Sequence, residues 1–311
     1  MTKNEPGISD NEEAFLKIEA DIIAFEHDAT LCEEQNFDQR LDAIDFLEFH
    51  IIDHIESLIE KAAQPNQLIL LKQRAENIKL ELAAIDNNLF KKLRADIRAN
   101  GCTGEQFKNL VSKYIDINTG DNNHEEAGYD NLDIFINGLL SSHPIPGQTK
   151  DLEPEMVFYQ KTPARIIFEL VEKAYVIEDD VFFDLGSGLG QQAILVNLLT
   201  GAKATGVEFE PAFCNYAGDC AKELNLPGVT FINTDARQAD YSDGTVFFMY
   251  TPFRGEILQD VLALLRKESL TRKIKIITYG PCTAQVALHS WLDFTISNNG
   301  NIYKPAVFTS I

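Results

Sequence analysis

The chain has few basic side chains for its size. Among 311 residues, 27 Lys and Arg stand against 48 Asp and Glu, which gives a formal net charge of −21. Because phosphate-rich ligands usually require a basic stripe, this balance makes nucleic acid an unlikely partner. No apolar run reaches the ~18 residues that a membrane span needs, and residues 1–7 lack the basic and apolar pattern of a secretory signal. We therefore expect no membrane association.

Cysteine is also scarce, and the five cysteines are scattered without any C-x-x-C pair. An odd number of isolated cysteines argues against a disulfide framework and against a zinc site, so we expect free thiols and a cytoplasmic protein. His50 and His54 stand four residues apart, but the H-E-x-x-H pattern is missing. We therefore expect no metal site.

The acidic side chains are concentrated near the start of the chain. Residues 9–60 contain 16 acidic and 2 basic side chains, whereas residues 61–115 contain 10 basic and 5 acidic ones. In one interpretation, which we favour, acidic helices pack beside a basic helix and the charges compensate each other. In the other, a negative face recruits a basic protein partner.

Two domains are expected from the length and from the change of pattern near residues 142–150. Residues 1–145 show apolar residues at three- and four-residue steps, which predicts an acidic, all-helical N-terminal domain that serves as a substrate cover or an interaction module. The expected helices cover residues 10–34, 38–62, 67–98, about 103–115 and 131–140, with a polar loop over 116–129 and a linker over 141–150. Residues 150–311 form the second domain.

The second domain alternates strand and helix patterns throughout, which predicts an α/β fold with helices on both faces of a parallel sheet. A helix is expected to begin at Thr162-Pro163, with the threonine as its cap. The last two strand patterns, residues 291–297 and 302–310, predict a closing antiparallel hairpin. The sequence therefore predicts a seven-stranded, mostly parallel, doubly wound sheet. Its first five strand patterns are residues 181–183, 203–209, 229–236, 245–250 and 274–279.

A glycine-rich turn follows the first of these strands. It reads Asp184-Leu185-Gly186-Ser187-Gly188-Leu189-Gly190-Gln191, with a helix pattern over residues 191–200. Glycines let a backbone approach a ligand closely, and a helix N-terminus offers unpaired N–H groups. The spacing G-x-G-x-G differs from the G-x-G-x-x-G of dinucleotide folds. It resembles motif I of class I S-adenosylmethionine (SAM) methyltransferases, and the longer phrase is similar to that of the Dot-family histone lysine methyltransferases.

This resemblance implies SAM as the cofactor and assigns residues at three strand ends. Glu208, 24 positions after Asp184, would bind the ribose diol, and Asp235 with the backbone of Ala236 would meet the adenine amino group. Residues 159–162, Tyr-Gln-Lys-Thr, are similar to the Tyr-Gly-Glu-Thr cofactor loop of the Dot family. Lys161 is a candidate to approach the carboxylate end of the cofactor or to gate the pocket. The implied cofactor-binding residues are Tyr159, Thr162, Asp184, Gly186, Ser187, Gly188, Gly190, Gln191, Glu208, Asp235 and Ala236.

The acceptor side is less sharply indicated. Tyr250, Thr251 and Phe253 follow the fourth strand, where the class places its substrate-facing loop, so we take them as the catalytic candidates. This loop departs from the (Asn/Asp/Ser)-Pro-Pro-aromatic element of enzymes that methylate nucleic-acid amines, and also from the Dot-family acceptor motif. Three functions stay open: a methyltransferase acting in line on a protein side chain such as a lysine amine, one acting on a small molecule, or a non-catalytic binding module. A closed pocket of a few hundred Å³ would favour the small molecule, and an open channel would favour a protein.

Overall fold

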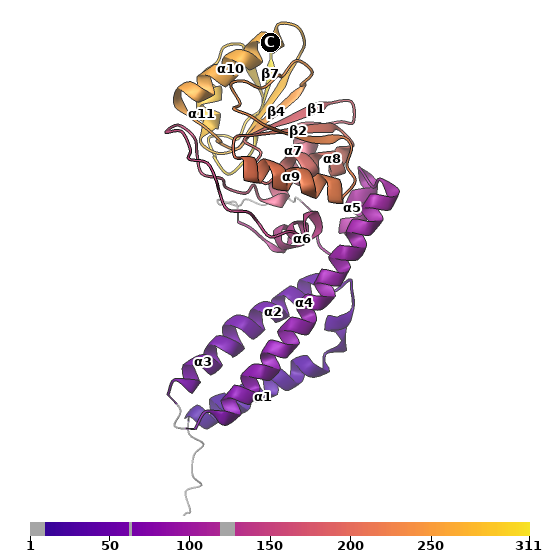
Figure 1. Cartoon of the computed structure of the whole chain (residues 1–311), viewed down its shortest axis with the longest axis vertical. Coiled ribbons are helices and arrows are strands. Elements are labelled where there is room, and N and C mark those ends of the chain that lie inside the picture. The colour runs from indigo at the N-terminus through magenta and orange to yellow at the C-terminus, as the bar shows by residue number, and fades with distance from the viewer. Residues whose placement is uncertain (1–9, 62–63, 119–127) are drawn as a thin grey trace, which may run out of the picture. The chain divides into compact units, whose positions relative to one another are not determined.

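The structure is a computed structural model, and it describes residues 10–61, 64–118 and 128–311 (Figure 1). The chain divides into two compact units, Met1–Lys92 with Lys113–Ile115, and Leu93–Ser112 with Asp116–Ile311. The first unit is helical, and the second contains the sheet. Most of the polar loop expected over 116–129 lies outside the described residues. No helix in the described part of the chain has the length and apolar character needed to cross a bilayer.

The helical unit is built from amphipathic helices that bury one apolar stripe each. Ile18 and Ile22, Leu47 and Ile51, and Leu71 and Ala75 face a shared core at helical spacing. Figure 1 shows these helices running alongside one another. They are α1 (Asp10–His27), a 3-10 turn η1 (Ala29–Cys32), α2 (Phe37–Asp45), a π-helical stretch η2 (Phe46–Ile52), α3 (Asp53–Ile59) and the first part of α4 (Asn66–Asn100).

Two expected helices of this unit are interrupted. The helix expected over 10–34 stops at His27, because the Asp28 carboxylate accepts hydrogen bonds from both Thr30 N (3.0 Å) and Thr30 Oγ1 (2.6 Å) and starts the separate turn η1. The helix expected over 38–62 contains the π-helical stretch η2. Periodicity alone did not reveal either break.

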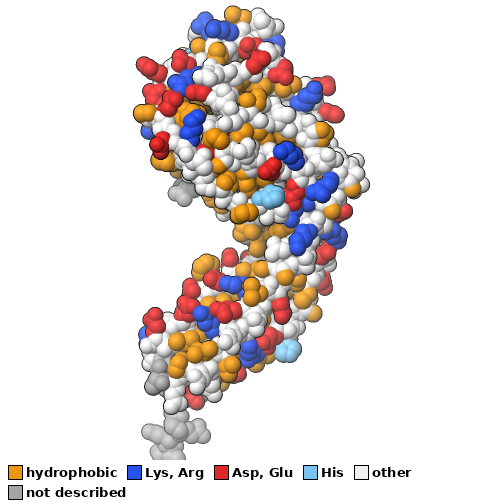
Figure 2. Space-filling view, viewed as in Figure 1, with side chains coloured by type: hydrophobic (Ala, Val, Ile, Leu, Met, Phe, Trp, Pro, Cys, Tyr) orange, Lys and Arg blue, Asp and Glu red, His pale blue; other side chains and the backbone are white. Residues whose placement is uncertain are grey.

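Charges in the helical unit compensate each other across helices. Basic side chains of α4 pair with acidic ones of the earlier helices, and on the face drawn in Figure 2 blue and red side chains lie side by side over these helices. These pairs are Arg74–Glu26 (2.7 Å), Lys72–Glu56 (2.7 Å), Lys92–Glu34 (2.6 Å) and Lys79–Glu48. They compensate four of the 16 acidic side chains of residues 9–60, as the first interpretation predicts for part of the charge. In the buried pair Arg40–Asp86 (2.7 Å) the base is on α2 and the acid on α4.

The second unit carries the predicted seven-stranded sheet, in the order β3-β2-β1-β4-β5-β7-β6. The first five strands are parallel, and β7 is antiparallel to both β5 and β6, so the expected hairpin and fold class are confirmed. The strands are β1 (Val181–Leu185), β2 (Lys203–Glu208), β3 (Val229–Asn233), β4 (Val246–Met249), β5 (Lys275–Thr278), β6 (Leu292–Ile296) and β7 (Ala306–Ser310).

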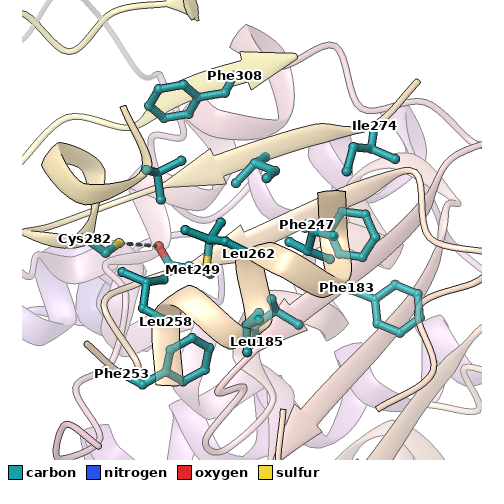
Figure 3. Packing of buried hydrophobic residues seen from close by; sticks show 14 of the residues in the cluster. Phe183, Leu185, Phe247, Met249, Phe253, Leu258, Leu262, Ile274, Cys282 and Phe308 are labelled. Carbon is teal, nitrogen blue, oxygen red and sulfur yellow. Dashed lines mark hydrogen bonds between the residues drawn. The ribbon is translucent and has the colours of Figure 1, made fainter. Parts of the chain in front are cut away.

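Helices cover both faces of this sheet (Figure 1). On one face β1, β4 and β5 contribute Phe183, Phe247 and Ile276, which pack against Leu258 and Leu262 (Figure 3). The opposite face lies against α7, α8 and α9. The helices of this unit are the end of α4, α5 (Glu105–Val111), α6 (Asn131–Leu140), α7 (Ala164–Lys173), α8 (Gln191–Thr200), α9 (Pro211–Glu223), α10 (Gly255–Ser269) and α11 (Cys282–Val286).

Two local details differ from the sequence-based expectation. Thr162 does not cap α7: the helix begins at Ala164, whose N–H donates to Asp133 Oδ1 of α6 at 2.8 Å. Strand β7 begins at Ala306 and not at residue 302, because Lys304 N and Asn301 O form a turn at 3.2 Å before it.

Candidate functional site

A cavity lies at the carboxyl ends of the central parallel strands. Gly186 lines it from the end of β1, residues 207–210 from β2, residues 234–236 from β3, and residues 250–253 from β4. Open parallel sheets bind ligands at this edge, beside the point where strand order reverses between β1 and β4. The position of the cavity is therefore that of the cofactor site implied by the glycine-rich loop.

Residues 148–160, here called the wall segment, form one side of the cavity. Near its start, Glu210 accepts hydrogen bonds from Thr149 N (2.9 Å) and Lys150 N (2.7 Å). Burial opposes ionisation of Glu210, but these hydrogen bonds and those from Thr149 Oγ1 and Ala212 N lower its pKa to about 2. Near its end, the segment pairs with the loop after β4 through Val157 N and Pro252 O (3.0 Å). The segment lines the cavity through Gln148, Leu152 and residues 156–160.

Two close approaches explain the first glycines of the loop. A Cβ on Gly186 would come within 2.3 Å of Pro252 Cβ, so the loop after β4 lies directly against the loop after β1. Gly188 has a φ of +53° and lies under the ring of Tyr159. This ring separates Gly188 from the cavity. The third glycine, Gly190, faces Ala217 and Phe231, so its environment is that of a packing position between α8, α9 and β3.

Glu208 lies at the end of β2 as expected, and its carboxylate is turned towards the glycine-rich loop. It accepts hydrogen bonds from Gly188 N (2.6 Å) and Glu210 N (2.8 Å). Burial raises its pKa, although these hydrogen bonds work in the opposite direction. Glu208 also lines the cavity, so it connects the loop after β1 with the ligand-facing surface.

Several buried polar atoms around the loop have no hydrogen-bond partner in the protein. Among the described residues they are Tyr159 Oη, Asp184 Oδ2, Ser187 Oγ, Gln191 Oε1 and Gln192 Oε1. Burial and the nearby Glu208 raise the pKa of Asp184 well above its usual range. Native proteins rarely leave such groups unsatisfied. Tyr159 and Gln192 line the cavity, so a ligand that carries amino, carboxyl and hydroxyl groups would supply partners for their atoms. The residues present therefore fit SAM.

Asp235 and Ala236 both line the cavity after β3, but the Asp235 carboxylate already has a partner. Arg237 donates to it from Nε (3.0 and 3.1 Å) and from Nη2 (2.5 Å). These hydrogen bonds lower the pKa of Asp235, so it is ionised at neutral pH. Any contact of Asp235 with an adenine amino group would be shared with Arg237.

The three catalytic candidates after β4 line the cavity in different ways. Tyr250 presents an aromatic ring at 4.7 Å from that of Tyr279, and its hydroxyl donates to Gln160 Oε1 at 3.2 Å. The Thr251 hydroxyl lies between Tyr279 O (3.3 Å) and Cys282 N (3.1 Å), so it organises its own loop. Phe253 is 4% exposed and packs beside Leu258 in the core (Figure 3).

Several predicted residues lie beside the cavity and do not line it. Asp184, Ser187 and Gly188 are covered as described, and Thr162 and Gln191 lie behind the glycine-rich loop. Thr162 Oγ1 accepts a hydrogen bond from Gln192 Nε2 at 2.6 Å. Lys161 points away from the cavity, and its ammonium donates to Asn137 Oδ1 of α6 at 2.5 Å. It therefore neither gates the pocket nor reaches the cofactor site.

Other lining residues were not predicted from the sequence. Gln192, one position after Gln191, lines the cavity from the first turn of α8. The periodicity of residues 191–200 was a usable signal for it, because a residue on that turn faces the strand ends. The wall residues before Tyr159 gave no such signal, since their positions depend on partners far away in the sequence. Arg237 was not predicted either, although Asp235, one of its partners, is only two positions away.

The match to a protein-family model supports this assignment of the site. The model of histone methylation protein DOT1 matches residues 155–247, from the wall segment to β4. Among solved structures, an RNA methyltransferase from Salinibacter ruber in complex with S-adenosyl-L-homocysteine is 26% identical over 49% of this chain and 92% of its own, with a TM-score of 0.39. A putative methyltransferase, yhhF, from Escherichia coli is 16% identical over 54% of this chain and 90% of its own, with a TM-score of 0.41. No curated protein gave a significant match.

The sheet order, the glycine-rich loop after β1 and the family match together define a class I SAM-dependent methyltransferase. The match covers the cofactor half of the second unit and ends before residues 250–253. It therefore identifies the cofactor and the reaction type. The acceptor has to be inferred from the geometry of residues 250–253, which the match does not cover.

Proposed function

We propose that this methyltransferase transfers a methyl group to an amine of a basic protein, such as a lysine side chain. Glu208 binds the ribose hydroxyls, and Ala236 with Asp235 receives the adenine. Gln192, which lines the cavity, meets a polar group of the methionyl part with its Oε1, an atom without a protein partner among the described residues. SAM supplies a methyl group that its sulfonium charge has already activated.

The observation that carries the proposed acceptor is the aromatic, uncharged character of the end of the cavity after β4. Tyr250, Phe253 and the wall residue Phe158 line it, and the lining carboxylates Glu208, Glu210 and Asp235 all follow β2 or β3. Aromatic faces attract an ammonium group by cation–π interaction. Phe158 is 77% exposed, so this end opens to solvent as a protein side chain requires.

The same surroundings help to generate the nucleophile. An apolar, partly buried site favours the neutral amine over the ammonium, so the acceptor loses its proton to water before its lone pair attacks. Burial raises the pKa of the Tyr250 phenol, which therefore stays protonated and is no base at neutral pH. The contribution of the protein is alignment: Pro252, in contact with Gly186, fixes the aromatic end against the cofactor loop.

The charge of the chain and the family match agree with a basic protein acceptor. A net charge of −21 attracts a basic protein and repels RNA. The matching model is described as a histone methylation protein, and histones are basic proteins. A small-molecule acceptor would explain neither the charge nor the exposed Phe158.

An acceptor screen tests the proposal. The purified full chain is incubated with radiolabelled SAM and, separately, with core histones, an unrelated basic protein, total RNA and a metabolite extract. We expect label in a basic protein, stable to alkali as an N-methyl group, and lost with Tyr250→Ala. Label in RNA or in the metabolite fraction alone would overturn the acceptor class. A protein that binds S-adenosylhomocysteine but methylates nothing in any pool would favour the non-catalytic module.

A further inference from the structure

The loops after β2, β3 and β4 hold the wall segment, and they do so by different chemistry. At β2 and β4 the wall contributes its own backbone, through Thr149 N and Lys150 N to Glu210 and through Val157 N to Pro252 O. At β3 the connection consists of side chains alone: Arg237 Nη2 donates to Glu153 Oε2 at 2.8 Å. This third connection can therefore be removed without changing any backbone hydrogen bond.

Arg237 joins two carboxylates at once. Its Nη2 group donates to Glu153 of the wall at 2.8 Å and to Asp235 of the cavity lining at 2.5 Å, and its Nε donates to Asp235 as well. A planar guanidinium suits such a bridge, whereas a lysine ammonium lacks the fork geometry. The side chains of Arg237 and Glu153 are 30% and 43% exposed, so salt weakens their interaction.

We propose that Arg237 is a positioning residue for the cofactor pocket, because it ties the wall segment at Glu153 to Asp235 at the adenine end. Asp235 then contributes to cofactor affinity mainly by holding Arg237 and, through it, the wall. Direct recognition of the adenine amino group by the Asp235 carboxylate contributes less. This inference rests on the proposed cofactor site, and it predicts how the site responds to changes outside the cofactor's reach.

Binding measurements with two ligands distinguish these roles. One ligand is S-adenosylhomocysteine, and the other is S-inosylhomocysteine, in which oxygen replaces the adenine amino group. We expect Glu153→Gln and Arg237→Met each to raise the Kd roughly threefold to tenfold, by the same factor for both ligands. We expect the double variant Glu153→Gln/Arg237→Met to bind both ligands no more weakly than Arg237→Met alone. Arg237→Lys should recover part of the affinity. In 0.5 M NaCl we expect the Kd of the wild type to approach that of Glu153→Gln.

The matched control is Glu268→Gln. Glu268 also pairs with an arginine, Arg272, at 2.8 Å, but on α10 and with no residue that lines the cavity. We expect its Kd values to equal those of the wild type, and thermal melts show that every variant is folded.

The outcomes separate the inference from the proposed function. If the wild type binds S-adenosylhomocysteine and Glu153→Gln binds it equally well, Arg237 does not act through the wall and the inference is wrong. The same holds if Asp235→Asn weakens S-adenosylhomocysteine only and leaves S-inosylhomocysteine unchanged, since that pattern is direct recognition of the amino group. A wild type that binds neither ligand contradicts the cofactor site itself.

Discussion

The ring of Tyr159 lies over Gly188, where a Cβ on the glycine would come within 2.0 Å of Tyr159 Cε2. This contact joins the end of the wall segment to the middle of the glycine-rich loop. Neither residue can change size without moving the other, so the loop and the wall form one structure. The first prediction follows from this contact.

We expect Gly188→Ala to raise the Kd for S-adenosylhomocysteine at least about tenfold, because alanine at a φ of +53° costs roughly 1–2 kcal/mol and also displaces Tyr159. Isothermal titration measures the loss. The matched control is Gly218→Ala: Gly218 lies inside α9 with no atom within 4 Å of an added Cβ. That variant should bind normally and gain up to about 1 kcal/mol in stability. Equal affinity in both variants would contradict the role of Gly188.

We expect Asp184→Asn to stabilise the ligand-free protein. Asp184 is 1% exposed, and its Oδ2 has no partner, so burial raises the pKa of its carboxyl above the unfolded value. Such a group stabilises the fold at low pH, and this stability is lost as pH rises through the folded pKa. The variant should raise the Tm by about 2–4 °C at neutral pH and make the decline of Tm with pH shallower.

The control for this substitution is Asp260→Asn on the exposed face of α10, which should leave the Tm and its pH dependence unchanged. A lower Tm for Asp184→Asn at neutral pH would mean that the Asp184 carboxylate is stabilised in the ligand-free protein. Its burial without a partner would then not describe the protein in solution.

How far the sequence predicted the molecule depended on the range of the interactions. Helix α8 was predicted at residues 191–200, because a glycine-rich turn and continuous apolar spacing are local signals. Of the wall segment only Tyr159 and Gln160 were expected near the site, from the resemblance to a cofactor loop. The residues before them were not predicted, since they have no periodicity and Glu155 Oε2 accepts from Ile257 N, 102 positions away. Asp235 shows a different limit. Its place after β3 was expected, but the sequence did not indicate that the guanidinium of Arg237, two positions further on, binds its carboxylate.

Within the candidate site, residue type was a better guide than residue orientation. Lys161 and Thr162 belong to the segment that resembles a cofactor loop, yet Lys161 bonds Asn137 and Thr162 bonds Gln192. Both orientations depend on α6 and α8, which pack behind the glycine-rich loop. A motif fixes which residues approach a site, and the tertiary contacts decide which side chains enter it.

In the helical unit, burial decides the value of two ion pairs of the same length. Arg40–Asp86 and Arg74–Glu26 both measure 2.7 Å, but Arg40 is fully buried and also donates to Leu31 O and Glu33 O. We expect Arg40→Met to cost about 3–5 kcal/mol, because it leaves Asp86 and these carbonyl groups buried without partners. Arg74→Met should cost less than about 1 kcal/mol. Urea unfolding followed by circular dichroism at 222 nm measures both, and equal losses would contradict the argument.

The last prediction concerns the acceptor end of the cavity. It tests whether Tyr250 acts through its aromatic ring or through its hydroxyl as a catalytic base. The Tyr250 ring lies 4.7 Å from Tyr279, and its hydroxyl bonds only Gln160 Oε1 among the hydrogen bonds found in the described residues. If the ring face binds the acceptor amine, Tyr250→Phe should keep kcat/KM within about fivefold, since a single neutral hydrogen bond is worth about 1 kcal/mol. Tyr250→Ala should lower it about 30-fold or more, mainly through KM, because the ring and its cation–π contact are lost.

The pH profile adds an independent readout to this comparison. Because the raised pKa of Tyr250 keeps the phenol protonated at neutral pH, the profile of kcat/KM for Tyr250→Phe should coincide with that of the wild type. Tyr175→Ala, at a tyrosine 79% exposed in the turn before β1, is the control and should leave all parameters unchanged. A Phe variant that loses its alkaline limb, or that is as inactive as the Ala variant, would show that the hydroxyl takes part in the reaction and that the ring is secondary.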